Sequence, residues 1–161
     1  MKTVTTRDIE TRLMRSYYKF NTFCCLEVGI VFKVKKPHKR YPQYLVTRHE
    51  TEICDFMIYE QNKDVFRCFE IKVSKSDFHS KAKKTFVGNY NYYVMPKDLY
   101  LQVGDEIPKE IGVLDEWCNC LKKPRKVSLK YDKEKLLVSM LKSLNRENYK
   151  NFYEKLRNNK S

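Results

Sequence analysis

Two neighbouring runs of alternating residues constrain the fold most. Residues 51–60 read TEICDFMIYE, residues 65–74 read VFRCFEIKVS, and the QNKD between them forms a turn. Successive side chains of a strand point to opposite faces of its sheet. The alternation therefore predicts an antiparallel hairpin. The side chains of its second strand should lie on opposite faces of the sheet. One face should carry Phe69, Ile71 and Val73, and the other should carry Phe66, Cys68, Glu70 and Lys72.

The first strand of this hairpin also carries an acid. Its alternation places Asp55 with Ile53, Met57 and Tyr59, and it places Cys54 with Phe56 on the other face. A solvent-exposed ion-pair face is the alternative for Glu70 and Lys72. Because Phe66 and Cys68 share their face, we favour a site in which acid and base act together.

The rest of the chain predicts a mixed α/β domain. The order is helix, three strands, helix, strand, small helix, strand and C-terminal helices. The expected bounds are a helix from Thr5 or Thr6 to Tyr18, a strand over 23–34, a basic turn over 35–42, a helix from Ser74 or Ser76 to Phe86, a strand over 91–95, a helical turn near 97–103, a strand over 111–117, a helix from Asp132 and a further helix in 145–160. Gly88 should end the helix that precedes the fourth strand.

Charge points to a polyanion as partner. The 161 residues contain 33 Lys and Arg against 20 Asp and Glu, a net charge of +13 with a pI near 9.4. Nucleic acid is the first expectation, and charges that only solvate the protein are the alternative. No apolar run is long enough to span a membrane, and the N-terminus lacks the apolar region of a signal peptide. We expect one cytoplasmic domain over 1–161, in which 127–161 is a basic helical extension.

The six cysteines form no CxxC pair, and no His stands at the spacing of a zinc finger. Reduced thiols are expected in the cytoplasm. A zinc site built from Cys118, Cys120 and a distant Cys or His is the alternative.

Asp55, Glu70 and Lys72 together favour phosphodiester hydrolysis. Two carboxylates on neighbouring strands, with the carbonyl oxygen of Ile71, can bind a hard cation such as Mg²⁺ or Mn²⁺. A cation bound to a phosphate polarises it and lowers the pKa of attached water. A nearby lysine offsets the charge that develops.

The order Asp55, then Glu70-Ile71-Lys72 fifteen residues later, resembles the PD-(D/E)XK nuclease superfamily. The E-x-K-x-S-x-x-D-F stretch over 70–78, with NYYVMP and IPKEIGVL further on, is similar to MmcB-like DNA repair endonucleases of bacteria and phages. The likeness covers residues 5–145, and Cys54 stands where the superfamily's proline would be. It implies a restriction-endonuclease-like core of a helix, a three-stranded meander, a helix and a strand. It also implies Asp55 and Glu70 as metal ligands, Lys72 as the catalytic lysine, and Glu10 as the acid of the first helix.

Further residues are candidates for DNA contact. They are Lys75, Lys81, Lys83 and Lys84 around the second helix, Lys35, Lys36 and Arg40 in the basic turn, and Asn91 in the tyrosine-rich strand. A solvated face is the alternative for the lysines, and a core role is the alternative for the tyrosine-rich strand.

The leading hypothesis is therefore a Mg²⁺- or Mn²⁺-dependent DNA endonuclease or repair nuclease that acts on duplex, branched or single-stranded DNA. One alternative is a catalytically silent module on the same fold that binds DNA or a partner, such as a phage accessory protein. A dimeric junction resolvase is the other, and it requires a homodimer.

Overall fold

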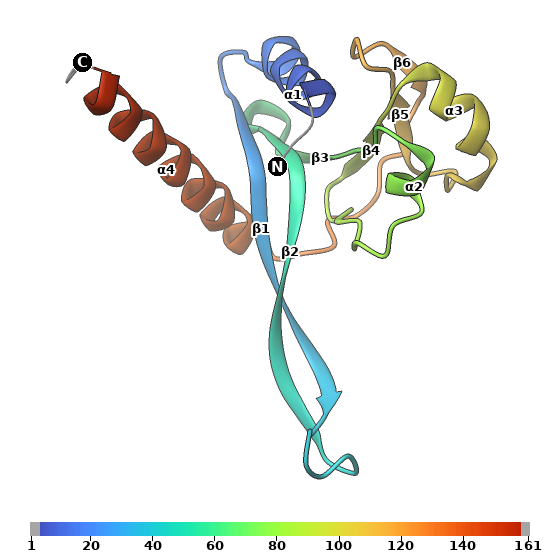
Figure 1. Cartoon of the computed structure of the whole chain (residues 1–161), viewed down its shortest axis with the longest axis vertical. Helices are drawn as coiled ribbons and strands as arrows, with labels where there is room; N and C mark the ends of the chain where they lie inside the picture. Colours follow the sequence, from blue (N-terminus) through green and yellow to red (C-terminus); the bar gives the residue numbers. More distant parts are fainter. Residues whose placement is uncertain (1–3, 159–161) are drawn as a thin grey trace.

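One six-stranded sheet organises residues 4–158, the part of the chain that the structure, a computed structural model, describes (Figure 1). The elements are α1 (Val4–Tyr17), β1 (Thr22–Pro37), β2 (Leu45–Glu60), η1 (Gln61–Lys63), β3 (Val65–Ile71), α2 (Lys75–Phe78), β4 (Tyr90–Val94), α3 (Lys97–Val103), η2 (Gly104–Glu106), β5 (Gly112–Leu114), β6 (Cys120–Lys122) and α4 (Lys133–Asn158). The predicted mixed α/β class is confirmed. No helix within 4–158 combines the length and the apolar character needed to cross a membrane.

The strands follow sequence order across the sheet, from β1 to β6. β1, β2 and β3 form the predicted antiparallel meander. β4 lies parallel to β3, and β5 lies parallel to β4, so longer connections containing α2 and α3 link these strands. β6 returns antiparallel to β5. The hairpin predicted from residues 51–74 thus lies inside the sheet, as its second and third strands.

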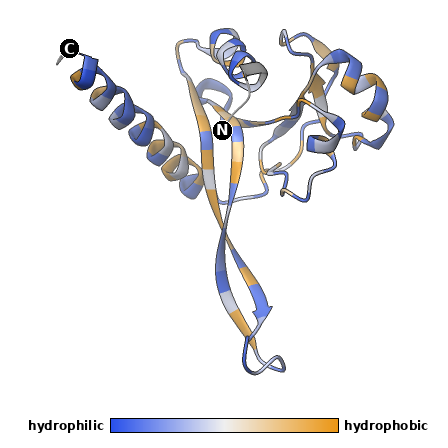
Figure 2. Ribbon diagram, viewed as in Figure 1, coloured by the Kyte–Doolittle hydropathy of each residue, from blue (hydrophilic) through white to orange (hydrophobic). Residues whose placement is uncertain are grey.

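Helices cover the two faces of the meander. On one face Ile9 and Leu13 of α1 pack with Phe56 and Phe69. On the other face the cluster includes Leu136 and Met140 of α4 with Met57, Phe66 and Cys68. Figure 2 shows hydrophobic and hydrophilic residues alternating along β1 and β2. This is expected because successive side chains of a strand point to opposite faces of the sheet.

The C-terminal region differs from the prediction of two helices. α4 is one continuous helix of 26 residues, and its first half packs against the sheet while its end extends away from it (Figure 1). α1 also begins at Val4, ahead of the predicted cap at Thr5 or Thr6.

The β1–β2 hairpin is longer than predicted. Both strands have 16 residues, and their pairing continues to Pro37 opposite Leu45, so the strand does not end at residue 34. β3 pairs with β2 only from Phe56 onward. The remaining part, residues 29–53, is a two-stranded ribbon that projects from the body and is called the ribbon below (Figure 1).

The second helix is much shorter than predicted. The expected helix reached Phe86, but α2 spans only Lys75–Phe78 and is capped by Ser74, whose Oγ accepts the N–H of Asp77 at 3.2 Å. The segment after it bonds to other parts of the chain instead, since the backbone N–H of Thr85 donates to Oε1 of Glu70 at 3.0 Å. A helix through Phe86 would need this N–H for its own hydrogen bonds.

Candidate active site

The structure brings Asp55, Glu70 and Lys72 to one cavity of about 560 Å³, called the site cavity below. Asp55 comes from β2, Glu70 from β3, and Lys72 directly follows β3. The other lining residues are Glu50, Thr51, Glu52, Ile53, Ala82 and Lys83. The predicted constellation of two acids and one amine thus shares a single cavity.

Asp55 lies where the regular pairing of the strands is interrupted. The β1–β2 register passes over Glu27 and Asp55, and Glu27 adopts a left-handed backbone conformation with φ of 49°. Cys54 consequently packs with Met57, so the prediction that it faces the same way as Phe56 is wrong. The interruption leaves Asp55 beside β3, where its Oδ2 accepts the N–H of Ile71 at 2.8 Å.

Glu70 is an acid with very little access to water. It is 2% exposed, and its Oε1 accepts the backbone N–H of Thr85 at 3.0 Å. Burial, followed by the negative charge of Asp55, raises the pKa of Glu70 to about 8, although the Thr85 N–H and Lys72 act in the opposite direction. Glu70 is therefore largely protonated near neutral pH, and a cation bound between it and Asp55 would favour its ionised form.

Lys72 is fixed by the turn that follows β3. Its backbone N–H donates to the carbonyl of Val94 at 2.9 Å, and its Nζ lies 3.6 Å from Oδ1 of Asp77. The Lys72 side chain is 7% exposed. Oδ2 of Asp77 accepts the N–H of Val73 at 3.1 Å, so Asp77 braces the turn as well as the amine. The ammonium group is thereby held at the site cavity.

The potential metal ligands in the site cavity are carboxylates, without the Cys or His that zinc sites commonly use. Within residues 4–158 no group of three or more His, Cys, Asp or Glu side chains is arranged to hold a metal, and this includes the region of Cys118 and Cys120. Mg²⁺ in proteins is commonly held by one or two carboxylates together with waters and substrate phosphates. Asp55 and Glu70 supply two such carboxylates, whereas Ile71, the predicted third ligand, is not among the residues that line the cavity.

Glu10 is not part of the same lining. It is 8% exposed and lines a different cavity together with Arg7 and Arg15. The structure therefore does not bring Glu10 to the site cavity, in contrast to the role that the resemblance implies.

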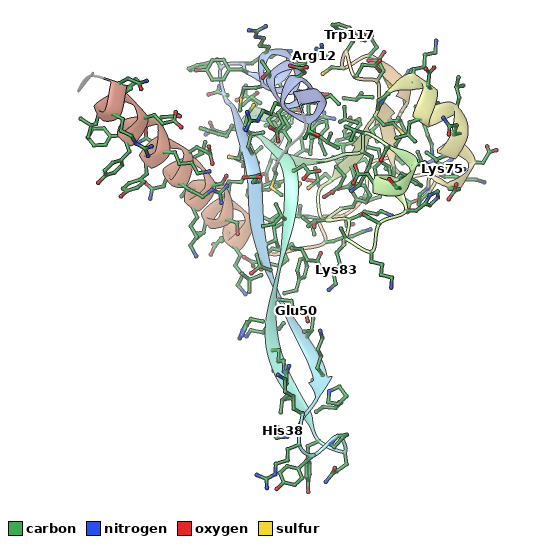
Figure 3. All side chains as sticks on the ribbon, in the orientation of Figure 1. Arg12, His38, Glu50, Lys75, Lys83 and Trp117 are labelled. Atoms are coloured by element: carbon green, nitrogen blue, oxygen red, sulfur yellow. The ribbon has the colours of Figure 1, made fainter. Side chains whose placement is uncertain are left out.

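The predicted phosphate-binding lysines differ in their surroundings. Lys83 lies beside Glu50 at the base of the ribbon (Figure 3), with its Nζ 3.1 Å from Glu50 and 3.0 Å from Glu52. Lys36 also forms an ion pair with Glu50. Lys84 lies over the ring of Phe78, 5.1 Å from its centroid. The other predicted cations, Lys35, Arg40, Lys75 and Lys81, are exposed.

Asn91 has a structural role. It is 2% exposed, its Oδ1 accepts the N–H of Gly88 at 3.0 Å, and its Nδ2 donates to the carbonyl of Gly88 at 3.0 Å. The prediction that Asn91 contacts DNA is therefore wrong for this fold, because DNA would have to disrupt a buried turn to reach it. Tyr92 and Tyr93 are likewise core residues.

Sequence reasoning missed the role of the segment at Thr85. Its backbone N–H holds Glu70, while its Oγ1 donates to Glu52 at 3.4 Å. Every residue except proline offers a backbone N–H, so the sequence does not mark Thr85 as a donor. The sequence also predicts a helix over this segment. The irregular path of residues 79–89 in the structure reveals this role.

Comparison with known proteins provides a fold relationship. No family model matches the sequence, and no curated protein matches it. The solved structure of the SPO1766 protein of unknown function from Silicibacter pomeroyi matches with a TM-score of 0.58 and 12% sequence identity. The match covers 100% of this chain and 97% of that one, so the two proteins share their fold over their whole length.

Proposed function

We propose that this protein is a metal-dependent DNA endonuclease or repair nuclease that hydrolyses phosphodiester bonds. The observation that carries the proposal is that Asp55, Glu70 and Lys72 line one cavity. The element order α1, β1, β2, β3, α2, β4 supports it, because it follows the restriction-endonuclease-like core that the PD-(D/E)XK resemblance implies. Asp55 on the second strand and Glu70 on the third also agree with that resemblance.

Asp55 and Glu70 would hold Mg²⁺ or Mn²⁺, with the carbonyl of Ile71 as a further oxygen donor. The bound ion would polarise the scissile phosphate and lower the pKa of attached water. The N–H groups of Ile71 and Thr85 orient the two carboxylates before any substrate arrives. Because burial raises the pKa of Glu70, this residue must lose a proton to bind the ion near neutral pH, so cation affinity should increase with pH up to about 8.

Lys72 would act on the phosphate itself. Its ammonium group is a compact positive charge in a buried position, where electrostatic interactions are stronger than in water. It can offset the negative charge that develops on the phosphate oxygens during attack. Asp77 keeps the amine in place, at 3.6 Å, without sharing the cavity lining.

A cleavage assay tests this function. Labelled duplex, single-stranded, flapped and branched DNA are incubated with Mg²⁺, Mn²⁺ or EDTA, and the wild type is compared with Lys72→Ala. Lys97→Ala is the matched control, because Lys97 is exposed, absent from the cavity lining and not a predicted DNA contact. We expect metal-dependent cleavage that Lys72→Ala abolishes and Lys97→Ala retains. Wild-type protein that is inert on every substrate would refute the enzymatic proposal.

A non-cleaving DNA-binding module is the second candidate, and the net charge of +13 favours it. Binding that depends on salt but survives Asp55→Ala and Glu70→Ala, without stabilisation by any divalent cation, would support this candidate over the nuclease.

A further inference from the structure

The ribbon is a regular, projecting structure rather than a flexible loop. The pairing of β1 with β2 is continuous from Gly29 opposite Ile53 to Pro37 opposite Leu45. The eight residues from Ile30 to Pro37 extend about 26 Å at roughly 3.3 Å per residue. Figure 1 shows the two strands crossing in this view, as a twisted two-stranded ribbon does. A structure of this kind can present side chains in a fixed arrangement far from the body.

The ribbon is strongly basic beyond its base. Residues 29–49 contain no Asp or Glu, whereas their lysines and arginines are Lys33, Lys35, Lys36, Lys39, Arg40 and Arg48. The acids Glu50 and Glu52 follow at the base, where they pair with Lys36 and Lys83. Positive charge is thus concentrated toward the tip, although Lys36, which lies opposite Val46, is paired with Glu50.

One face of the ribbon carries uncompensated charge. Residues directly opposite each other share a face, which places Lys33 with His49 and Lys35 with Thr47. All four are exposed. They form, with the tip residues Lys39 and Arg40, the surface called the basic face below.

We propose that the basic face of the ribbon lies in a groove of duplex DNA. The bound ribbon thereby positions the duplex at the site cavity. This inference rests on the proposed nuclease function and narrows its substrate to duplex. The major groove of B-DNA is about 12 Å wide and admits a two-stranded ribbon, whose strands lie about 4.8 Å apart. The positive charge of the basic face matches the phosphates that border the groove.

The base of the ribbon borders the site cavity. Residues of both faces line that cavity there, namely Glu50 and Glu52 as well as Thr51 and Ile53, while Lys33 and His49 line a separate cavity beside Tyr131. From Thr47 to Asp55 the strand β2 runs eight residues, which corresponds to roughly 26 Å. This length is less than one helical turn of DNA, about 34 Å. One turn of duplex can therefore contact the ribbon and the site at the same time.

A single strand fits the ribbon less well. Sequence-tolerant binding of single strands relies on exposed aromatic rings on which bases stack. Below the tip the aromatic residue of β1 in the ribbon is Phe32, and it packs edge-on against Tyr131, with centroids 5.3 Å apart. The exposed tyrosines Tyr41 and Tyr44 lie only at the tip.

Fluorescence anisotropy in EDTA tests the proposal without cleavage. The dissociation constant for a labelled 20-base-pair duplex and for one of its strands is measured over a range of salt concentrations. Each lysine that contacts a phosphate contributes about 0.9 to the slope of log Kd against log salt, which equals a factor of about 8 at 0.1 M salt. Lys33→Gln/Lys35→Gln should therefore lower the slope by about 2 and weaken duplex binding roughly 60-fold.

Two further variants complete the experiment. Lys39→Gln/Arg40→Gln at the tip should lower the slope by a similar amount. Lys97→Gln/Lys109→Gln removes the same charge from exposed positions in and beyond α3, and it should leave the slope unchanged. Duplexes shorter than about 10 base pairs, less than one turn, should bind more weakly than longer ones.

The proposal is overturned if both ribbon variants bind duplex as the wild type does, if the control loses as much affinity as they do, or if the single strand binds as tightly as the duplex. Failure of the proposed function has a different signature. Thermal stabilisation of the DNA-free protein by Mn²⁺ reports on Asp55 and Glu70 alone, and it should persist in Lys33→Gln/Lys35→Gln.

Discussion

Replacing Glu70 by Gln should stabilise the metal-free protein at neutral pH. The pKa of Glu70 is raised from 4.5 to about 8, by burial first and by the charge of Asp55 second. The unfolded chain therefore ionises this residue from pH 4.5 upward, while the folded protein keeps it protonated until about pH 8. Stability is lost as pH rises through this window. Gln retains the oxygen that accepts the Thr85 N–H and never ionises, so it avoids the loss.

The magnitude follows from the pKa difference. One pKa unit corresponds to 1.36 kcal/mol, so the wild type should lose about 3 kcal/mol between pH 4.5 and pH 7 through Glu70 alone. For a chain of this size 1 kcal/mol changes Tm by about 2–4 °C, which gives a Tm difference of roughly 6–12 °C at pH 7. Urea denaturation in EDTA measures the free energy of unfolding of both proteins from pH 4.5 to 8.5.

The difference between the two proteins isolates Glu70 from other titrating groups. It should be close to zero at pH 4.5, increase by about 1.4 kcal/mol per pH unit, and level off near pH 8. Glu60→Gln is the matched control, and its change in the free energy of unfolding should have the opposite sign. Burial raises the pKa of Glu60, but hydrogen bonds from Lys63 and Arg67 lower it overall, so this variant should be destabilised near neutral pH. A Glu70→Gln difference that is independent of pH, or that decreases with it, would refute the assigned environment.

Two further predictions concern the neighbours of these residues. Asp55→Asn should lower the pKa of Glu70, because the charge of Asp55 contributes to its shift, and carbon NMR of the Glu70 carboxyl group should show titration at lower pH than in the wild type. Asn91→Ala removes both side-chain hydrogen bonds to Gly88 inside the protein, so urea denaturation should show a loss of ~2 kcal/mol or more, while duplex affinity of the folded protein stays unchanged. A strong loss of affinity without loss of stability would instead place Asn91 at the DNA.

Much of the central hairpin could be predicted from sequence because its physics is local. Alternation over 65–74 correctly separated Phe69 and Ile71 from Phe66 and Cys68, and it correctly placed Glu70 beside Lys72. Neighbouring strands then brought Asp55 close to both. The apolar spacing of the first helix and the start of the last one were also sufficient to locate them.

The errors arose where tertiary contacts override local preference. The left-handed conformation at Glu27 interrupts the alternation and reverses the face of Cys54, and no pattern in β2 reveals it. Residues 79–86 have a helical composition, but bonds to β2 and β3 hold this segment in another conformation. The ribbon is long because β1 and β2 continue to pair past the charged residues, in a region where the sequence suggested a turn.

Asn91 and Glu10 illustrate the limit for single residues. Asn91 resembles a surface amide in sequence, yet it satisfies a buried turn at Gly88. Glu10 occupies a suitable helix, yet it lines another cavity. Such roles depend on which elements lie next to each other in the fold. The spacing of residues within one element does not reveal this.

Calorimetric titration with Mn²⁺ tests most directly whether Asp55 and Glu70 act together on one cation. The wild type, Asp55→Asn and Glu70→Gln are titrated at pH 8, with Glu52→Gln as the control that lines the same cavity but pairs with Lys83. We expect one ion to bind to the wild type and to Glu52→Gln, and neither variant of the two acids to bind it. Equal binding by all four proteins, or by none, would contradict a cation site formed by these two carboxylates.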